Sequence, residues 1–196
     1  MNVRSATVAR VTAIGAGAAV TAAIPLTFSA GGGASGLDSA VPDVSPGLAP
    51  LLVIPSNAPV VAALLLVACA WFVLRRQWWQ AVTMLVVPEV ALAVNTWLLK
   101  PLWDRQFHDF LAYPSGHTVH MVAVATTFAC LVTDRLTRVV VAVLTVLALI
   151  VITPGMAALG YHRPTDVLGG AAAAVAMSIT LCWISDALRG GREQGA

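Results

Sequence analysis

Two short polar segments stand out in a sequence that otherwise carries little charge. The first, residues 100–117, reads KPLWDRQFHDFLAYPSGH and contains the cations Lys100 and Arg105 together with two histidines. The second, residues 161–166, reads YHRPTD and contains a histidine and an aspartate four positions apart. Only 10% of the chain is Asp, Glu, Lys or Arg. Cations, a hydroxyl, histidines and a carboxylate are the groups that cleavage of a phosphate ester requires.

The first segment contains the groups that hold a phosphoryl oxygen and protonate a leaving group. Lys100 and Arg105 supply positive charge, and Ser115 supplies a hydroxyl. The backbone N–H groups of Gly116 and His117 are expected to open a helix, where unpaired donors and the helix dipole favour an anion. The imidazole of His117 can then protonate a leaving oxygen.

The second segment contains a candidate nucleophile. Pro164 suits the first turn of a helix, where its missing N–H costs nothing. If that turn is helical, the four-residue spacing places Asp166 beside His162 on one face. A carboxylate in this position fixes the tautomer of the imidazole and stabilises its cationic form. The pattern thus favours His162 as a nucleophile supported by Asp166.

The rest of the chain has the composition of a membrane scaffold. Of its 196 residues 59% are hydrophobic, with a mean hydropathy of +0.85, whereas a soluble domain is about half apolar and about a quarter charged. The net charge of +2 gives no indication of a nucleic-acid partner. We therefore predict an all-α, polytopic membrane helix bundle of about six transmembrane helices. The predicted spans are residues 11–30, 59–74, 78–99, 116–133, 139–160 and 167–188.

The chain divides into three predicted regions. Residues 1–57 form a transmembrane helix and an extracytoplasmic loop rich in Gly, Pro and Ser, residues 58–188 the helical membrane domain, and residues 189–196 a cytoplasmic tail. The first helix could instead be a signal peptide, because small residues follow it at positions 29–31. Its apolar length favours a retained helix. The loop has no periodicity, and no binding role is predicted for it.

The distribution of cations predicts the orientation. With both termini in the cytoplasm, eight of the eleven Lys and Arg residues lie inside, as the positive-inside rule requires. The remaining three, Lys100, Arg105 and Arg163, belong to the two polar segments. Both segments are therefore expected to meet at the extracytoplasmic surface.

Two further polar residues fall inside predicted spans. Glu89 is a carboxylate at membrane depth, where such groups are often functional; a protonated side chain bonded to a neighbouring helix is the interpretation we favour. His120 follows His117 at a spacing compatible with a metal, but packing within the bundle is favoured and no metal is predicted. The three cysteines indicate neither a disulfide framework nor a zinc site.

These motifs resemble those of the type 2 phosphatidic acid phosphatases, a family that shares its site with the vanadium haloperoxidases. The family's Pro-Ser-Gly-His motif stands intact at residues 114–117, and its His-x-x-x-Asp motif stands at residues 162–166. The resemblance covers roughly residues 60–188. The two motifs together, on one membrane face, are far more specific than either alone.

The sequence departs from the family pattern in two places. The first motif of the family is Lys, six residues, then Arg-Pro, whereas here only four residues separate Lys100 from Arg105, and no proline follows. The third motif normally opens with Ser-Arg, the arginine lying six residues before the histidine. Gly155 and Met156 occupy these positions here. The neighbouring Arg163 is a candidate replacement for the missing arginine.

The resemblance implies a set of roles and a class of substrate. His162 would form a phosphohistidine, Asp166 would support it, and His117 would be the general acid. The implied phosphate ligands are Lys100, Arg105, Ser115 and Gly116, with Arg163 added as the replacement. The substrate would be a polyprenyl or glycerolipid phosphate or diphosphate, cleaved without a cofactor outside a bacterial plasma membrane. No protein partner can be inferred.

Two alternatives remain open at this stage. A non-catalytic membrane protein could bind phospholipid head groups in a degenerate site of this kind, with Met156 marking the loss of catalysis. A haloperoxidase is a weaker alternative, because those relatives are soluble and this chain has six apolar segments.

Overall fold

The computed structural model describes residues 3–29, 33–39 and 41–194. The predicted all-α fold is confirmed, and each apolar segment forms a helix. The long helices are α1 (Val3–Ala23), α3 (Ala58–Leu74), α4 (Trp78–Val94), α6 (Gly116–Leu131), α7 (Arg135–Ala158) and α8 (Pro164–Gln194).

Four helical stretches are long and apolar enough to cross a membrane, which identifies an integral membrane protein. They are Thr7–Thr27, Trp78–Trp103, Arg135–Ala158 and Pro164–Gly190. The apolar helices α3 and α6 have 17 and 16 residues and are shorter than a typical span. The count of six spans thus stays a prediction.

The connections contain short elements of their own. The segment predicted as an irregular loop between α1 and α3 includes several helical turns, and the segment between α4 and α6 ends in a small hairpin. The turns in this predicted loop are η2 (Gly36–Ser39), α2 (Ala49–Leu52) and η3 (Ile54–Ser56), while η1 (Ile24–Thr27) lies within the predicted first span. The later elements are the π-helix η4 (Asn95–Leu99), α5 (Lys100–Trp103), β1 (Gln106–Phe107) and β2 (Phe110–Leu111), of which the two strands are antiparallel.

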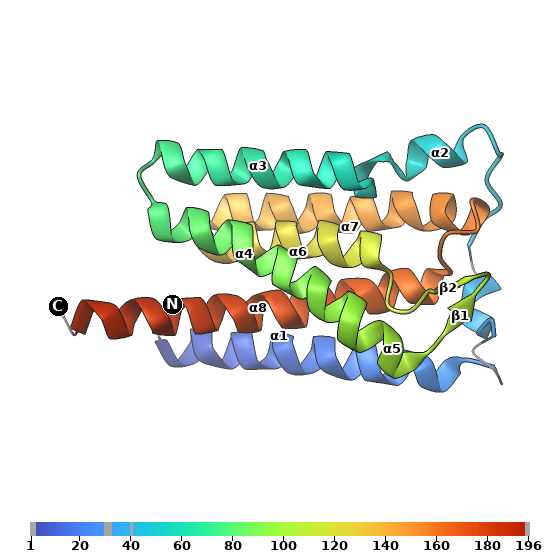
Figure 1. Ribbon diagram of the computed structural model, residues 1–196, viewed down its shortest axis with the longest axis horizontal. Helices are drawn as coiled ribbons and strands as arrows, with labels where there is room; N and C mark the ends of the chain where they lie inside the picture. Colours follow the sequence, from blue (N-terminus) through green and yellow to red (C-terminus); the bar gives the residue numbers. More distant parts are fainter. Residues whose placement is uncertain (1–2, 30–32, 40, 195–196) are drawn as a thin grey trace.

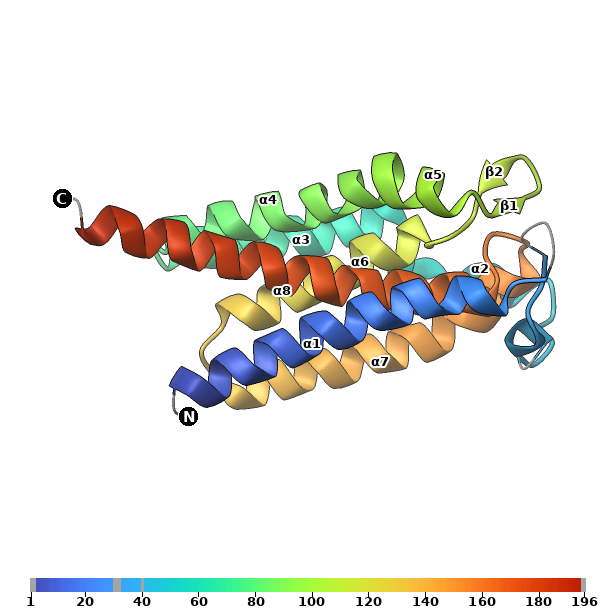
Figure 2. The same cartoon turned by 90° about the horizontal axis from the view of Figure 1, so that it is seen from below.

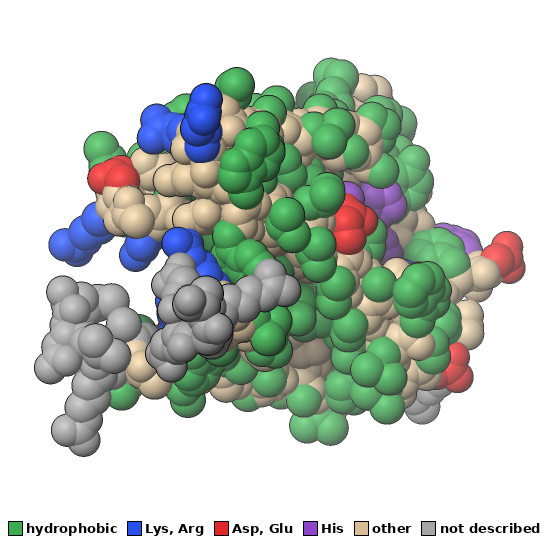
Figure 3. Space-filling view, turned by 60° about the vertical axis from the view of Figure 1, so that its left-hand side comes forward, with side chains coloured by type: hydrophobic (Ala, Val, Ile, Leu, Met, Phe, Trp, Pro, Cys, Tyr) green, Lys and Arg blue, Asp and Glu red, His purple; other side chains and the backbone are tan. Residues whose placement is uncertain are grey.

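The long helices run alternately up and down, so α1 begins and α8 ends at the same end of the bundle (Figures 1 and 2). The hairpin β1–β2, α2 and α5 lie at the opposite end, where α6 and α8 begin. Figure 3 shows Lys and Arg side chains on the side of the termini and histidines toward the other side, with mainly hydrophobic side chains between them. This separation agrees with the charge pattern used to predict the orientation.

α8 lies at the centre of the packing, against both α1 and α6. Small residues allow the first of these contacts. A Cβ on Gly17 of α1 would lie 2.7 Å from the backbone oxygen of Ala172 and 3.1 Å from the Cβ of Ala176 in α8. Backbones that approach this closely are typical of helix pairs in membranes. α8 continues to Gln194, so the region predicted as a tail is helical as far as the structure describes it.

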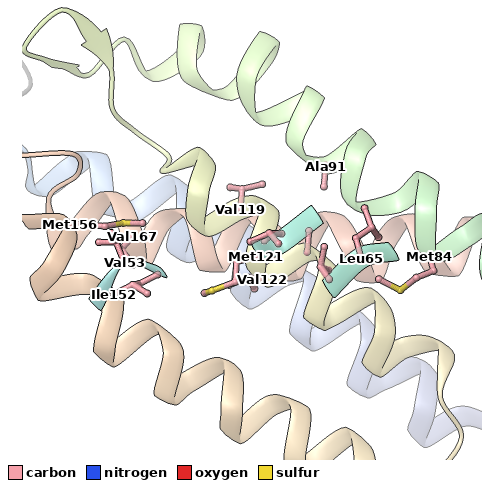
Figure 4. Packing of buried hydrophobic residues seen from close by; sticks show 14 of the residues in the cluster. Val53, Leu65, Met84, Ala91, Val119, Met121, Val122, Ile152, Met156 and Val167 are labelled. Atoms are coloured by element: carbon pink, nitrogen blue, oxygen red, sulfur yellow. The ribbon is translucent and has the colours of Figure 1, made fainter. Parts of the chain in front are cut away.

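The apolar core lies between α3, α4, α6, α7 and α8. Met84, Val119, Val122 and Ile152 are buried in it, with at most 2% of each exposed. Figure 4 shows these side chains, which come from different helices, in a row that runs from Ile152 past Val119 and Val122 to Met84. This core fixes α6 and α8, whose first turns carry the two motifs.

Candidate active site

α4, η4 and α5 form one continuous helical stretch that brings Lys100 to the site. The π-helical turn lies directly before Lys100, and such turns are frequent at functional sites. In this turn the buried Asn95 donates through Nδ2 to the backbone oxygen of Pro114 at 3.3 Å. The ammonium group of Lys100 donates to the backbone oxygen of Leu111. These two bonds tie the end of α4 to the loop that contains the Pro-Ser-Gly-His motif.

Ser115 is the N-cap residue of α6, and its Oγ accepts the backbone N–H of Thr118 at 3.4 Å. The backbone N–H of Ser115 donates to the backbone oxygen of Asp166 at 3.0 Å. The first-turn N–H groups of Gly116 and His117 have no intrahelical acceptor. The start of α6 is therefore a donor-rich turn that is joined directly to the first turn of α8.

Two glycines of α8 let this loop approach closely. A Cβ on Gly169 would lie 2.2 Å from the ring of Tyr113, and one on Gly170 would lie 2.8 Å from the backbone oxygen of Ser115. The hydroxyl of Tyr113 donates to the backbone oxygen of Thr21 in α1 at 2.6 Å. α1, α8 and the motif loop thus form one packed unit.

His117 and His162 both line a cavity of about 640 Å³, and their rings lie edge to face. Their ring centres are 5.8 Å apart, and the ring of His117 also stacks on that of Tyr161 at 6.3 Å. His117 is exposed, whereas His162 is only 4% exposed. The cavity is lined by Ser56, Asn57, Ala58, Leu92, Thr96, Lys100, Phe110, Gly116, His117, His120, Tyr161 and His162. Its size is that of a typical ligand pocket.

Asp166 lies behind His162, away from the cavity. Its Oδ2 atom accepts the backbone N–H of Arg163 at 2.9 Å and lies 3.9 Å from Nδ1 of His162. Its Oδ1 atom accepts a bond from Arg105 at 2.7 Å. The Nδ1 atom of His162 is buried and has no hydrogen-bond partner among the described residues. The carboxylate is therefore directed at the histidine without yet forming a hydrogen bond to it.

His162 lies in the turn between α7 and α8, and its pKa is lowered to about 3. Burial is the largest cause, followed by the positive charge of Lys100 and then by His117; a backbone hydrogen bond with Ala112 offsets part of the shift. The imidazole is thus neutral at ordinary pH, which is the form that can attack phosphorus.

Comparison with known proteins agrees with this geometry. Residues 93–189, which contain both motifs, match the family model of the PAP2 superfamily. The chain belongs to this superfamily. Members of it are phosphatases, and this supports a phosphatase-type function for the domain. No curated protein and no solved structure matches the chain.

Within this PAP2 domain, the predicted site residues fall into three groups. Lys100, Gly116, His117 and His162 line the cavity. Ser115, Asp166 and Arg105 are buried behind it, with at most 1% of each residue exposed. Arg163 is half-buried, and its guanidinium lies over the ring of Phe107 in the hairpin, 4.7 Å from the ring centre. The roles of all eight predicted residues, including phosphate binding by Arg105 and Arg163, stay predictions.

Met156, which stands where the PAP2 pattern has arginine, belongs to the apolar core. It is 1% exposed, and Figure 4 shows it beside Val53, Ile152 and Val167. Its backbone oxygen accepts the N–H of Tyr161 at 2.9 Å. The position therefore supports the turn that carries His162, while its side chain contributes packing.

Sequence reasoning missed Asp38, which lies in η2, far from both motifs along the chain. Its Oδ1 atom accepts both the backbone N–H and the hydroxyl of Thr165, at 3.0 and 2.7 Å, and its Oδ2 atom accepts from Arg105 at 3.0 Å. Burial alone would raise the pKa of Asp38, but hydrogen bonds from Ser35, Thr165 and Arg105 lower it. The sequence feature that could have pointed to Asp38 is that it is an acidic residue in a loop that contains no Lys or Arg.

Glu89 contacts a neighbouring helix, as the favoured interpretation of the sequence predicted. Its Oε1 atom lies 3.0 Å from Nε2 of His120, which itself lines the cavity below His117. In the part of the chain that the structure describes, no group of three His, Cys, Asp or Glu side chains could hold a metal ion.

Proposed function

We propose that this PAP2 protein hydrolyses a lipid phosphate or diphosphate, of polyprenyl or glycerolipid type, through a phosphohistidine at His162. The observation that carries the proposal is that His162 and His117 line the same cavity with ring centres 5.8 Å apart, while Asp166 lies 3.9 Å from Nδ1 of His162. A phosphoryl group bound in this cavity would have both the nucleophile and the proton donor within reach.

In the first step the ring nitrogen of His162 that faces away from Asp166 attacks phosphorus. The bond between phosphorus and the lipid oxygen breaks, and protonated His117 gives its proton to that oxygen. Lys100 and the N–H groups at the start of α6 hold the phosphoryl oxygens as negative charge develops on them. The lipid alcohol leaves, and His162 carries the phosphoryl group.

In the second step water attacks the phosphohistidine. Neutral His117 accepts the proton of the water, the bond between nitrogen and phosphorus breaks, and inorganic phosphate leaves. Asp166 stabilises the positive charge on His162 during both steps. The cycle returns His162 to its neutral form and His117 to its protonated form, so no cofactor is consumed.

The charge pattern supports an extracytoplasmic site in a bacterial plasma membrane. Arginine side chains gather at the end of the bundle where the described chain begins and ends, and this is the pattern expected of a cytoplasmic end. The cavity lies at the opposite end. In this arrangement all six apolar helices cross the membrane and both termini are cytoplasmic. The phosphorylated head of the lipid would enter the cavity while its chain stays between helices.

The packing of α1 supports a retained helix rather than a removed signal peptide. Loss of α1 would expose the small-residue face of α8 around Ala172 and leave the buried hydroxyl of Tyr113 without its acceptor, Thr21. Positions 30 and 31 of the possible cleavage sequence lie outside the described residues. Residues 1–57 would then be a structural part of the domain formed by residues 58–188.

Phosphate release by the detergent-purified protein, with a chelator present, tests the proposal. The panel consists of a polyprenyl diphosphate, a polyprenyl monophosphate, phosphatidic acid and phosphatidylglycerophosphate. We expect release from at least one lipid, and no release above background by His162→Ala. A matched control is His108→Ala, which removes an exposed histidine of the hairpin turn and should leave the rate unchanged.

A second candidate is a non-catalytic protein that binds phospholipid head groups. The burial of Met156 favours this second candidate. The PAP2 pattern has an arginine at this position, and here no arginine reaches the cavity from it. Lipid binding without phosphate release from any member of the panel would select this alternative. Halide oxidation that depends on added vanadate would instead indicate a haloperoxidase, whereas simple inhibition by vanadate fits the phosphatase.

A further inference from the structure

The guanidinium of Arg105 joins parts of the chain that are far apart in sequence. Its Nη1 atom donates to Thr165 at 2.6 Å and to Asp166 at 2.7 Å. Its Nη2 atom donates to the backbone oxygen of Gly33 at 2.9 Å and to Asp38 at 3.0 Å. One side chain thus links the first turn of α8 to the segment between α1 and α3.

Part of the pocket that holds Arg105 comes from outside the matched PAP2 region. Phe28 stacks against the guanidinium, whose Cζ atom lies 3.7 Å from the ring centre. Gly33 and Asp38 belong to the same segment, which precedes residue 93, where the match begins. The N-terminal segment of this chain therefore completes the surroundings of a residue next to the site.

The cluster is almost completely withdrawn from solvent. The side chains of Arg105 and Asp166 are 0% exposed, and that of Asp38 is 6% exposed. Buried charges are costly unless each is paired and hydrogen-bonded, and removal of one partner is strongly destabilising for the group that remains. Such a cluster holds its members in one arrangement more strictly than exposed ion pairs do.

We propose that Asp38 and Arg105 are positioning residues that act on the reaction through Asp166. The proposal rests on the proposed function, because it assigns Asp166 the task of orienting His162. Arg105 binds the Oδ1 atom of Asp166, and this leaves the Oδ2 atom on the side of His162. The rotation of the carboxylate is thereby fixed.

Asp38 holds this arrangement from two directions. Its Oδ2 atom binds Arg105, and its Oδ1 atom accepts the N–H and the hydroxyl of Thr165, the residue directly before Asp166. One carboxylate therefore fixes both the arginine that holds Asp166 and the helical turn that carries it. A small displacement here changes the distance between Asp166 and His162, and displacements of about 1 Å can cost about a hundredfold in rate.

Direct phosphate binding by Arg105 makes a different prediction. Arg105 is absent from the described lining of the cavity, where Lys100 is the cation. If Arg105 contacted phosphate, loss of its partner Asp38 would free it and change substrate affinity. If it acts through Asp166, the loss would lower kcat and leave KM unchanged. Asp38 itself does not line the cavity, so its substitution separates the two cases.

The experiment compares Asp38→Asn with Asp43→Asn. Both remove one negative charge from the same segment, but Asp43 is exposed. We expect Asp38→Asn to lower kcat about tenfold to a hundredfold, with KM and inhibition by inorganic phosphate within twofold of wild type. Asp43→Asn should match wild type in all three. Wild-type rates for Asp38→Asn, or a raised KM at unchanged kcat, would overturn the proposal.

Substitutions of Thr165 keep the test decisive if Asp38→Asn does not fold. Thr165→Val preserves the shape of the side chain and removes one bond to each of Asp38 and Arg105, whereas Thr165→Ser keeps the hydroxyl. We expect the valine variant to lose kcat and the serine variant to retain it. Equal rates in the two would contradict the proposal.

The outcome is distinguishable from failure of the proposed function. Wild-type protein and His162→Ala are measured on the same lipid, and a difference between them establishes catalysis at His162. If wild type releases phosphate and all Asp38 and Thr165 variants do so equally well, the positioning role alone fails. If wild type releases none, the proposed function fails.

Discussion

The Nδ1 atom of His162 and the Oδ2 atom of Asp166 are 3.9 Å apart, with both side chains buried. This distance is longer than a hydrogen bond, although no described group competes for Nδ1. Hydrogen bonds of catalytic groups are often long in the free enzyme and shorten when substrate binds. We therefore expect the pair to close as positive charge forms on the imidazole in the proposed reaction.

Asp166→Asn tests this relationship directly. We expect kcat to fall about a hundredfold or more, because an amide gives no charge to stabilise the cationic imidazole and can fix the wrong tautomer. The measurement is phosphate release at saturating substrate, made below the unfolding temperature of the variant. Asp109→Asn, in the exposed turn of the hairpin, is the control. A rate for Asp166→Asn within tenfold of wild type would remove Asp166 from the mechanism.

The lowered pKa of His162 predicts a loss of stability in acid. In the unfolded chain this histidine titrates near 6.5, whereas in the folded protein its pKa is about 3. The unfolded chain thus binds one proton more between these values, and stability falls as pH drops through this window and is restored above about 6.5. The contribution approaches about 1.4 kcal/mol per pH unit.

The comparison of wild type with His162→Gln between pH 7.5 and pH 4.5 isolates this contribution. The unfolding temperature of wild type should fall more steeply with decreasing pH, because the glutamine variant lacks the titrating group. His108→Gln, at an exposed position, should follow wild type. Parallel curves for all three proteins would contradict a buried, neutral His162.

The motifs and the helices could be predicted from the sequence because both depend on local spacing. Apolar runs set the helix bounds to within a few residues, apart from the ends of α1 and α8. The four-residue step from His162 to Asp166 brings the two side chains within 3.9 Å, although α8 begins only at Pro164 and His162 lies in the turn before it. The Pro-Ser-Gly-His motif places Ser115 as an N-cap. These features required no knowledge of distant contacts.

The partners of the buried charges could not be predicted in this way. A guanidinium binds carboxylate and phosphate with the same geometry, so the sequence did not distinguish Asp38 and Asp166 from phosphate as partners of Arg105. Asp38 lies 67 positions from Arg105, and no periodic pattern connects them. The same holds for Glu89 and His120, whose contact depends on how α4 packs against α6.

Gly169 should tolerate no larger side chain. A Cβ at this position would lie 2.2 Å from the ring of Tyr113, so Gly169→Ala must displace the motif loop or α8. We expect destabilisation of about 1–3 kcal/mol and a lower rate of phosphate release. Gly15→Ala is the matched control on α1, where a Cβ would meet nothing within 4 Å and alanine favours the helix. An unfolding temperature for Gly169→Ala equal to that of Gly15→Ala would contradict the close packing.

Met156→Arg would restore the residue that the PAP2 pattern has at this position, yet we expect it to destabilise the protein and to give no gain in phosphate release. The side chain is 1% exposed among apolar neighbours, and an unpaired buried cation costs several kcal/mol. Met156→Leu, which conserves volume, should cost less than about 1.5 kcal/mol. Unfolding temperature and phosphate release are measured for both variants. A faster rate for Met156→Arg, at an unfolding temperature near that of wild type, would mean that an arginine from this position reaches the cavity.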